Sequence, residues 1–274
     1  MRQKKVDGSV VGKLVKMQPT EVPEHLKKDK WARRKSDFDP NDYFTVLTHL
    51  SMKPGYTLDY AYLYFKRFAG EPLLYARPVG SRPFRSPGKY WEWRDRQLAE
   101  EWEKWISDDP VFADGKSDLT EEEERHKEDM KEAFLEKETK NILPRFMVLD
   151  GTPDSFFQLV VFTRLAGQFY LYWHAFYKNI KIVTSRDEME SLIDEITTKG
   201  HGAKLTDRQK ADLRAIDPDP QVKISRDTAA VTYCMFSKWG GLWQFTEKFS
   251  VTPPYRCAGT RQLAWVFYDC KLSF

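Results

Sequence analysis

The feature that most constrains the fold is an alternation of apolar and polar side chains near the C-terminal end of the sequence. In AAVTYCMFSKWGGLWQFTEKFSV, residues 229–251, two such runs flank Gly240-Gly241. A period of two is typical of half-buried strands, and two glycines can supply the positive φ angles of a tight turn. We therefore expect an antiparallel hairpin with Phe236 opposite Phe245 and Lys238 beside Trp243. The later run RQLAWVFYDCKL completes the sheet.

Other stretches have the spacing of helices. Pro40 follows Asp39 in the order typical of a helix start, and KPG at 53–55 ends that helix. The next runs, TLDYAYLYF and PLLYARPV, are rich in Tyr and Leu and are bounded by Gly and Pro, as strands are. Together these patterns predict the α+β class, a mainly antiparallel sheet with flanking helices.

The stretch TPDSFFQLVVFTRLAGQFYLYWHAFY, from Thr152, resembles the first helix and its strands. Both begin with a capping residue and Pro, continue through two aromatic residues and an apolar helical pattern, and reach Gly before a Tyr-rich strand. The matching residues are Pro40 and Pro153, Tyr43-Phe44 and Phe156-Phe157, and Gly55 and Gly167. We interpret this as a candidate internal duplication of a helix–strand–hairpin unit.

Between the two copies the sequence predicts a charged helical insert. Its apolar residues at helical spacing begin with Trp91, Leu98, Trp102 and Trp105. Thr120 and Glu123 match the capping box of a second helix, and fourteen of residues 121–140 are charged. We expect two helices that pack along one narrow seam and project from the domain.

These patterns divide the chain into a basic flexible arm, residues 1–36, and a single α+β domain, residues 37–274. The domain comprises a first helix–hairpin unit (37–80), the charged helical insert (81–145), a second helix–hairpin unit (146–200), and a helix with antiparallel C-terminal hairpins (201–274).

Cysteine usage and hydropathy indicate the compartment. The three cysteines, Cys234, Cys257 and Cys270, form no C-x-x-C pair, which argues against a disulfide framework and a thiolate zinc site. The basic start lacks the apolar run of a secretory signal, and no window approaches the roughly 18 apolar residues of a membrane span. We expect a soluble cytoplasmic protein without membrane attachment.

The charge is unevenly distributed. Residues 1–35 contain eleven Lys and Arg but four acidic residues, whereas the whole chain has a net charge of +3. A basic leader on a mildly acidic body is typical of a solvated tail, and also of a segment that binds nucleic acid. For the second case the candidate phosphate contacts are Lys4, Lys5, Lys27, Lys28, Arg33, Arg34 and Lys35.

Motifs of familiar chemistry are missing from the sequence. It contains no G-x-x-x-x-G-K-[ST] phosphate loop and no G-x-S-x-G nucleophile elbow. Its five histidines never fall at the spacings of a preformed metal site. The sequence therefore predicts no metal and no cofactor, and it favours a protein that is not an enzyme.

His174 lies in the densest aromatic block, FYLYWHAFYKNIKIV, residues 169–183. If residues 169–176 form a strand, one side is wholly apolar and faces the core. Its members are Phe169, Leu171, Trp173 and Ala175. The other side carries Tyr170, Tyr172, His174 and Phe176, rings with polar tips that suit a half-buried surface.

Three hypotheses follow. The leading one is a non-enzymatic interaction protein, an adaptor or a subunit of a larger assembly, with an unidentified protein partner. Its candidate partner-binding residues are Tyr170, Tyr172, His174, Lys178, Lys238, Trp239 and Trp243. The second is a nucleic-acid-binding accessory protein that uses the basic arm. The third is an enzyme centred on His174, with His49, Asp59 or Tyr172 as helpers.

Overall fold

The computed structural model describes residues 4–28, 34–112, 119–199, 204–238 and 240–268. Its helices and antiparallel sheets confirm the α+β class. The α-helices are α1 (Ser9–Met17), α2 (Pro87–Ser107), α3 (Glu121–Glu138), α4 (Pro153–Leu165), α5 (Arg186–Lys199) and α6 (Asp207–Ala215). The 3₁₀ helices are η1 (Glu24–Leu26), η2 (Pro40–Thr45), η3 (Thr139–Asn141), η4 (Leu143–Phe146) and η5 (His174–Lys178).

The strands form three sheets. They are β1 (Lys4–Lys5), β2 (Leu50–Met52), β3 (Tyr56–Phe65), β4 (Ala69–Pro78), β5 (Met147–Leu149), β6 (Tyr172–Trp173), β7 (Ile180–Val183), β8 (Gln221–Ile224), β9 (Thr228–Ser237), β10 (Gly241–Ser250) and β11 (Cys257–Val266). The largest sheet has the order β1-β8-β9-β10-β11, with β7 also paired to β9. The two smaller sheets are β2-β5 and β3-β4-β6.

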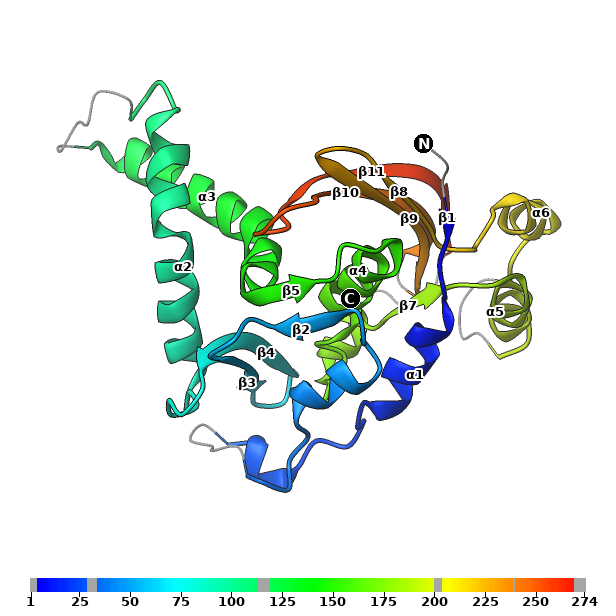
Figure 1. Cartoon of the computed structure of the whole chain (residues 1–274), viewed down its shortest axis with the longest axis horizontal. Helices are drawn as coiled ribbons and strands as arrows, with labels where there is room; N and C mark the ends of the chain where they lie inside the picture. The colour runs from blue at the N-terminus through cyan, green and yellow to red at the C-terminus, as the bar shows by residue number, and fades with distance from the viewer. Residues whose placement is uncertain (1–3, 29–33, 113–118, 200–203, 239, 269–274) are drawn as a thin grey trace.

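Helix α4 lies at the centre of the fold. Every side chain from Ser155 to Phe162 is buried, because the sequence of α4 is apolar on all sides. A helix of this kind must be covered from every direction. Figure 1 shows it beneath the arch of the six-stranded sheet, with β2 and β5 on its other side. It contacts β7, β8, β9, β2 and α1.

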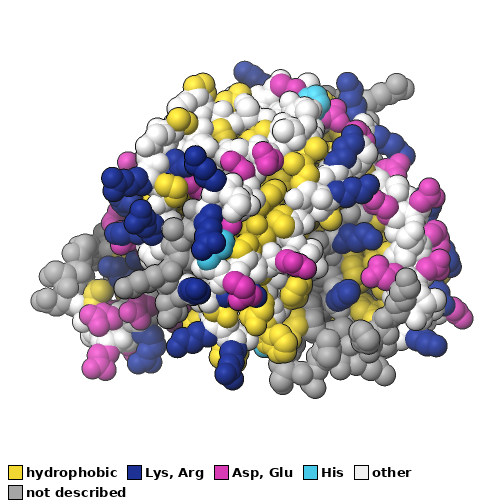
Figure 2. Space-filling model, turned by 90° about the horizontal axis from the view of Figure 1, so that it is seen from below, with side chains coloured by type: hydrophobic (Ala, Val, Ile, Leu, Met, Phe, Trp, Pro, Cys, Tyr) yellow, Lys and Arg dark blue, Asp and Glu magenta, His cyan; other side chains and the backbone are white. Residues whose placement is uncertain are grey.

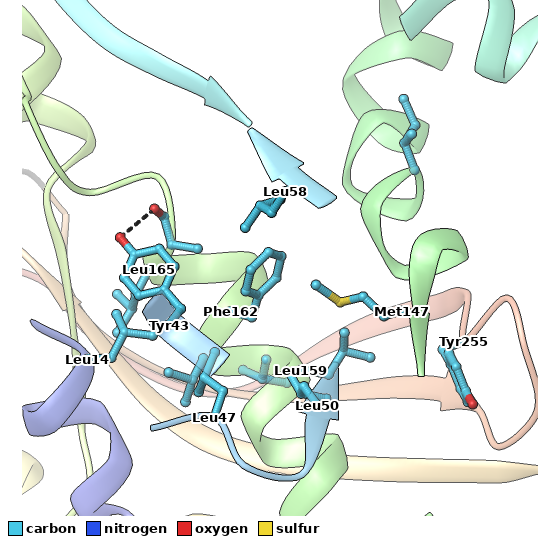
Figure 3. Packing of buried hydrophobic residues seen from close by; sticks show 14 of the residues in the cluster. Leu14, Tyr43, Leu47, Leu50, Leu58, Met147, Leu159, Phe162, Leu165 and Tyr255 are labelled. Carbon is cyan, nitrogen blue, oxygen red and sulfur yellow. Dashed lines mark hydrogen bonds between the residues drawn. The ribbon is translucent and has the colours of Figure 1, made fainter. Parts of the chain in front are cut away.

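Side chains from distant parts of the sequence converge on α4 (Figure 3). Leu14 of α1, Leu47, Leu50 of β2 and Leu58 of β3 all belong to its buried cluster. The hydroxyl of Tyr43 donates to the carbonyl of Ala166, just beyond α4, at 2.9 Å. The apolar residues of α4 thus hold together segments that are far apart in the chain.

The C-terminal hairpin exists, but its predicted register is wrong. Ser237 pairs with Gly241, so the connection has three residues, and Phe236 lies opposite Leu242 rather than Phe245. The positive φ of 91° falls on Gly241, the first residue of β10. A Cβ atom there would lie 2.1 Å from the carbonyl oxygen of Val266, which explains why glycine is needed.

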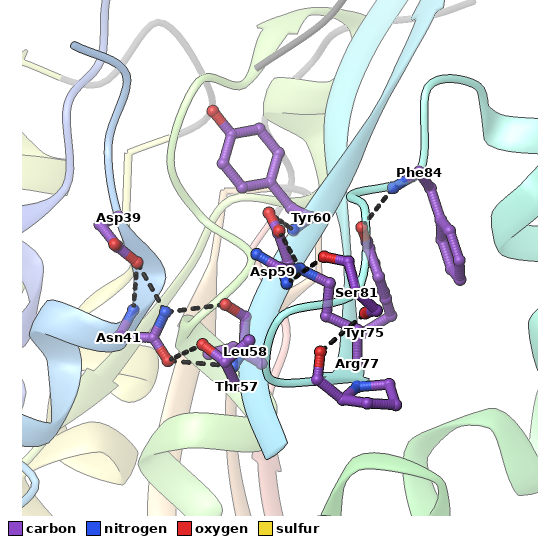
Figure 4. Close-up of polar contacts among 11 residues, drawn as sticks. Asp39, Asn41, Thr57, Leu58, Asp59, Tyr60, Tyr75, Arg77, Ser81 and Phe84 are labelled. Carbon is purple, nitrogen blue, oxygen red and sulfur yellow. Dashed lines mark hydrogen bonds and ion pairs between the residues drawn. The ribbon is translucent and has the colours of Figure 1, made fainter. Parts of the chain in front are cut away.

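The predicted helix start at Asp39-Pro40 is present, but the helix is the short 3₁₀ helix η2, which ends at Thr45, and Leu50–Met52 form strand β2 instead of its last turns. The carboxylate of Asp39 accepts a hydrogen bond from the backbone N–H of Asn41 at 3.0 Å. The Asn41 amide then accepts from the Leu58 N–H and donates to the Leu58 carbonyl (Figure 4). The Asn41 side chain therefore makes the two backbone hydrogen bonds that a neighbouring strand would make, and it fixes η2 against β3.

The segment 1–36, predicted to be a flexible arm, is ordered over most of its described part. Val10, Val11 and Leu14 of α1 are buried, as is Leu26 of η1. Strand β1 pairs with β8. The prediction failed because the charges of this segment obscured a short helical stripe of apolar residues.

Helices α2 and α3 lie at one side of the molecule (Figure 1). Trp102 and Trp105 of α2 pack on Phe134 of α3, with ring centres 5.4 and 5.3 Å apart. This contact agrees with the expected packing of the two helices along one narrow apolar seam. The capping box of Thr120 and Glu123 is confirmed.

At the other end of the molecule, α5 and α6 cover β9 and β10 with a second apolar cluster around Leu192. The internal duplication stays a prediction.

We expect Leu159→Ala in α4 to lower the free energy of unfolding by about 2–5 kcal/mol, because Leu159 is fully buried and its truncation leaves a cavity. Urea denaturation measures this effect. Val148→Ala is the control, since Val148 in β5 is 41% exposed and its truncation should change stability by about 0.5 kcal/mol or less. Equal losses in both variants would contradict the central role of α4.

Candidate functional site

Residues 169–176 do not form the continuous strand that the sequence predicts. Only Tyr172 and Trp173 pair with a neighbour, as β6 beside β4, and η5 begins at His174. The alternation fails because Tyr170 and Trp173 adopt positive φ angles of 53° and 50°. Each of these residues turns the chain, so successive side chains no longer alternate between two faces.

Tyr170 and Trp173 consequently exchange the environments predicted for them. Tyr170, a candidate partner-binding residue, is only 5% exposed. Its N–H donates to Pro19, its carbonyl accepts from the Tyr62 hydroxyl, and its own hydroxyl accepts from the Phe38 N–H. Trp173, predicted to be in the core, is 59% exposed. Tyr170 therefore joins core segments, whereas Trp173 is at the surface.

Exposed rings gather where the β3–β4 hairpin meets η5. Phe65, Phe68, Trp173 and Phe176 are each between 48% and 63% exposed. His174 connects several of them, because its ring lies 6.4 Å from Phe68 and 5.6 Å from Trp173. We call this surface the aromatic platform, and it consists of Tyr64, Phe65, Phe68, Tyr172, Trp173, His174, Phe176 and Tyr177.

The environment of His174 is aromatic rather than acidic. Its backbone N–H donates to the Phe68 carbonyl at 2.8 Å, which fastens η5 to the hairpin. Within the described ranges, no ion pair joins its imidazole to a carboxylate. The helpers named for an enzyme are engaged elsewhere: His49 pairs with Asp150, and Asp59 pairs with Arg77 at 2.7 Å (Figure 4). His174 is therefore surrounded by rings, with Phe68 stacked on it and Trp173 and Tyr177 edge-on to it.

Basic side chains adjoin the aromatic platform. The Lys27 ammonium lies 5.7 Å from the centre of the Tyr172 ring, within the range of a cation–π contact. Lys66 and Arg67 are exposed between Phe65 and Phe68, and Lys178 pairs with Glu71 at 2.5 Å. Figure 2, a view from below, shows a band of hydrophobic side chains with Lys and Arg, and also Asp and Glu, along its borders. The structure thus brings part of the basic segment to the aromatic residues.

The other basic residues of the N-terminal segment are attached elsewhere. Lys4 and Lys5 lie in β1 at an edge of the six-stranded sheet, where Lys5 pairs with Asp219. Lys28, Arg34 and Lys35 are exposed, and Arg33 lies outside the described residues. The seven candidate phosphate contacts therefore do not form one continuous arm.

The second predicted partner surface lies around the C-terminal hairpin. Lys238 is exposed, and Trp239 lies outside the described residues. Trp243 is half-buried and stands opposite Trp265 of β11. Among the described strands β11 pairs only with β10, so its other side is an open edge. We call this the β11 edge, and its exposed apolar residues are Leu263, Trp265 and the adjacent Phe267.

A buried ion pair joins α4 to the large sheet, and sequence reasoning missed it. Arg164 donates to the Glu247 carboxylate and, at 3.0 Å, to the Tyr233 hydroxyl. Glu247 is only 2% exposed. The sequence could have indicated this pair, because Glu247 alternates with Phe245 and Phe249 along β10 and therefore points to the same inward face. A cavity of about 30 Å³ adjoins the pair, and a cavity of about 110 Å³ lies near Trp93.

Two observations bear on the chemistry available to the described residues. The described part of the chain holds no group of three His, Cys, Asp or Glu residues placed to bind a metal ion. Burial raises the pKa of the Cys234 thiol to about 12, so this thiol stays protonated at neutral pH.

Comparison with protein-family models, curated proteins and solved structures found no match. In the described ranges, no helix has the length and apolar character needed to cross a membrane.

We expect Glu247→Leu to cost about 3–5 kcal/mol of stability, because it leaves the Arg164 charge without its buried partner. The double variant Arg164→Met, Glu247→Leu should recover most of that loss. A double-mutant cycle by urea denaturation measures the difference. Losses that simply add would show that Arg164 and Glu247 are energetically independent.

The lowered pKa of the Asp150 carboxyl predicts that the stability of the folded protein depends on pH in the acid range. Partial burial opposes its ionisation, but hydrogen bonds from Thr152 and His49 outweigh it and lower the pKa of Asp150 to about 2. Its stabilisation is therefore present above the ordinary value of 3.8 and is lost as the pH falls towards 2. Asp150→Asn should be destabilised by up to about 1 kcal/mol at pH 6, with a flatter profile between pH 2 and 4. Thermal unfolding of the wild type and of Asp150→Asn between pH 2 and 6 tests this prediction. Parallel curves of stability against pH for the two proteins would contradict it.

Proposed function

We propose that the protein is a non-enzymatic interaction protein, an adaptor or subunit of a larger assembly, and that a protein partner adds a β-strand to the β11 edge. The observation that carries this proposal is the length and exposure of β11. It spans Cys257–Val266, and only one of its two sides is paired among the described strands.

An edge of this kind is normally protected in a protein that acts alone. Prolines, inward charges, β-bulges or covering loops block the row of free N–H and C=O groups on edge strands. Strand β11 has no proline and one charged residue, Arg261, although its pairing with β10 shifts register at Leu263 and at Ala258. Strand addition would satisfy its backbone groups, while side-chain contacts would determine which partner binds.

Trp265 of this edge, with Trp243 on the neighbouring strand β10, is suited to anchoring such a partner. The Trp265 indole N–H donates to the Gly240 carbonyl at 2.8 Å, so the ring is already oriented. Trp243 stands opposite it and stacks on Phe245 at 6.4 Å. Preoriented aromatic rings contribute much of the affinity at protein interfaces, because little side-chain entropy is lost.

The enzyme hypothesis has less support. His174 has aromatic neighbours, and His49 and Asp59 belong to other ion pairs. General acid–base catalysis requires a group within hydrogen-bonding reach of a reacting atom, and His174 does not line the cavities near Trp93, beside the Arg164–Glu247 pair or between α2 and α3.

A photo-reactive amino acid in place of Leu263 tests the proposal in cells that express the protein. We expect one cross-linked product that contains this protein and a single partner protein in a constant ratio, because Leu263 is exposed on the open edge. The same substitution at Val148, comparably exposed on β5, is the control and should give no such product.

Trp265→Lys should then abolish cross-linking from position 263 without changing the melting temperature, since a lysine on an edge strand opposes strand addition. Identical products from both positions, or an unchanged product in the Trp265→Lys variant, would contradict the proposal.

A further inference from the structure

The aromatic platform has a surface chemistry different from that of the β11 edge. Its exposed rings are accompanied by cations, whereas β11 has a single one, Arg261. We propose that the aromatic platform binds single-stranded nucleic acid, with bases stacked on its rings and phosphates held by the neighbouring basic side chains. This inference goes beyond the proposed protein partner and involves a separate surface.

The backbone at Trp173 supports a role for its exposed ring. Trp173 has φ 50° and ψ −119°, a conformation that only glycine adopts without strain. The turn at Trp173 brings the His174 N–H to the Phe68 carbonyl and leaves the indole 59% exposed. The backbone therefore holds this ring at the surface, where a ligand can stack on it.

The arrangement of the other rings suits successive bases. Phe68 and His174 are close to parallel, with an interplanar angle of 30°, whereas Tyr177 meets His174 edge-on at 67° and 5.0 Å, so its own face is turned in another direction. Tyr64 and Tyr172 form a neighbouring pair at 5.8 Å. Unpaired bases stack on such rings with little dependence on sequence, whereas a duplex keeps the faces of its bases inside the helix.

The charges around the rings are complementary to a phosphate backbone. Lys66 and Arg67 lie between two platform phenylalanines, and within the described chain neither forms an ion pair. Lys27 approaches the ring of Tyr172. The nearby acids Glu24 and Glu71 pair with Lys27 and Lys178, which partly neutralises those two lysines. The unpaired cations Lys66 and Arg67 therefore favour a polyanion over an acid-rimmed or purely apolar protein partner.

The test is fluorescence anisotropy of the full-length protein with a labelled oligothymidylate of roughly 12 nucleotides, a length within the site sizes of single-strand binders. We expect binding that weakens as salt rises from about 50 to about 200 mM, since bound phosphates release counterions. A duplex of equal length should bind at least about tenfold more weakly.

Trp173→Gly separates binding from folding. It should weaken oligonucleotide binding by roughly tenfold or more, because it removes a stacking ring. Its melting temperature should not fall, since glycine adopts this backbone conformation without strain. Trp265→Ala is the matched control, because Trp265 is similarly exposed, at 52%, but lies on the β11 edge, and it should keep full affinity. The double variant Lys66→Glu, Arg67→Glu should weaken binding and reduce its salt dependence.

Several results would overturn the inference. One is no salt-sensitive binding of the oligonucleotide, and another is equal binding of the duplex. Equal losses in Trp173→Gly and Trp265→Ala would show that the platform is not the binding surface. Binding to anionic phosphatidylserine vesicles that is lost in Trp173→Gly, while oligonucleotide affinity is unchanged, would assign the platform to a lipid surface instead.

Discussion

The burial of α4 on every side is the constraint on which the rest of the structure depends. An amphipathic helix needs one covering layer, but α4 has apolar residues all around its circumference. The curved sheet covers one side, and β2, β3 and α1 supply the remainder. For this reason the N-terminal segment is part of the core: Leu14 and Leu26 are fully buried in the same cluster as α4.

The same burial explains the position of the Arg164–Glu247 pair. Arg164 lies in the last turn of α4, where a cation is favoured by the helix dipole and the unpaired carbonyls. Because α4 lies under the sheet, this cation meets the inward face of β10, and an apolar residue there would leave it without a partner. Glu247 and the Tyr233 hydroxyl satisfy it, so the pair ties the end of α4 to β9 and β10.

Sequence patterns predicted the elements that local rules determine. The hairpin of β9 and β10, the β3–β4 pair and the capping box at Thr120 follow from periodicity and from short-range hydrogen bonding. The hairpin register was wrong because it depends on the close approach of Gly241 to β11, a contact between distant residues. The strand at 169–176 failed for a similar reason, since tertiary contacts of Tyr170 and Trp173 impose positive φ angles that their side chains disfavour.

Those two residues also explain why the aromatic platform exists beside such a well-covered core. Tyr170 is held inward by hydrogen bonds to Pro19, Tyr62 and Phe38, and this fixes where β6 begins. The chain must then reverse at Trp173, at a strain of about 1–3 kcal/mol, and the indole is directed outward. The His174 N–H closes the turn on the hairpin loop. The rings are therefore ordered before any ligand arrives, so a ligand need not supply the free energy to order them.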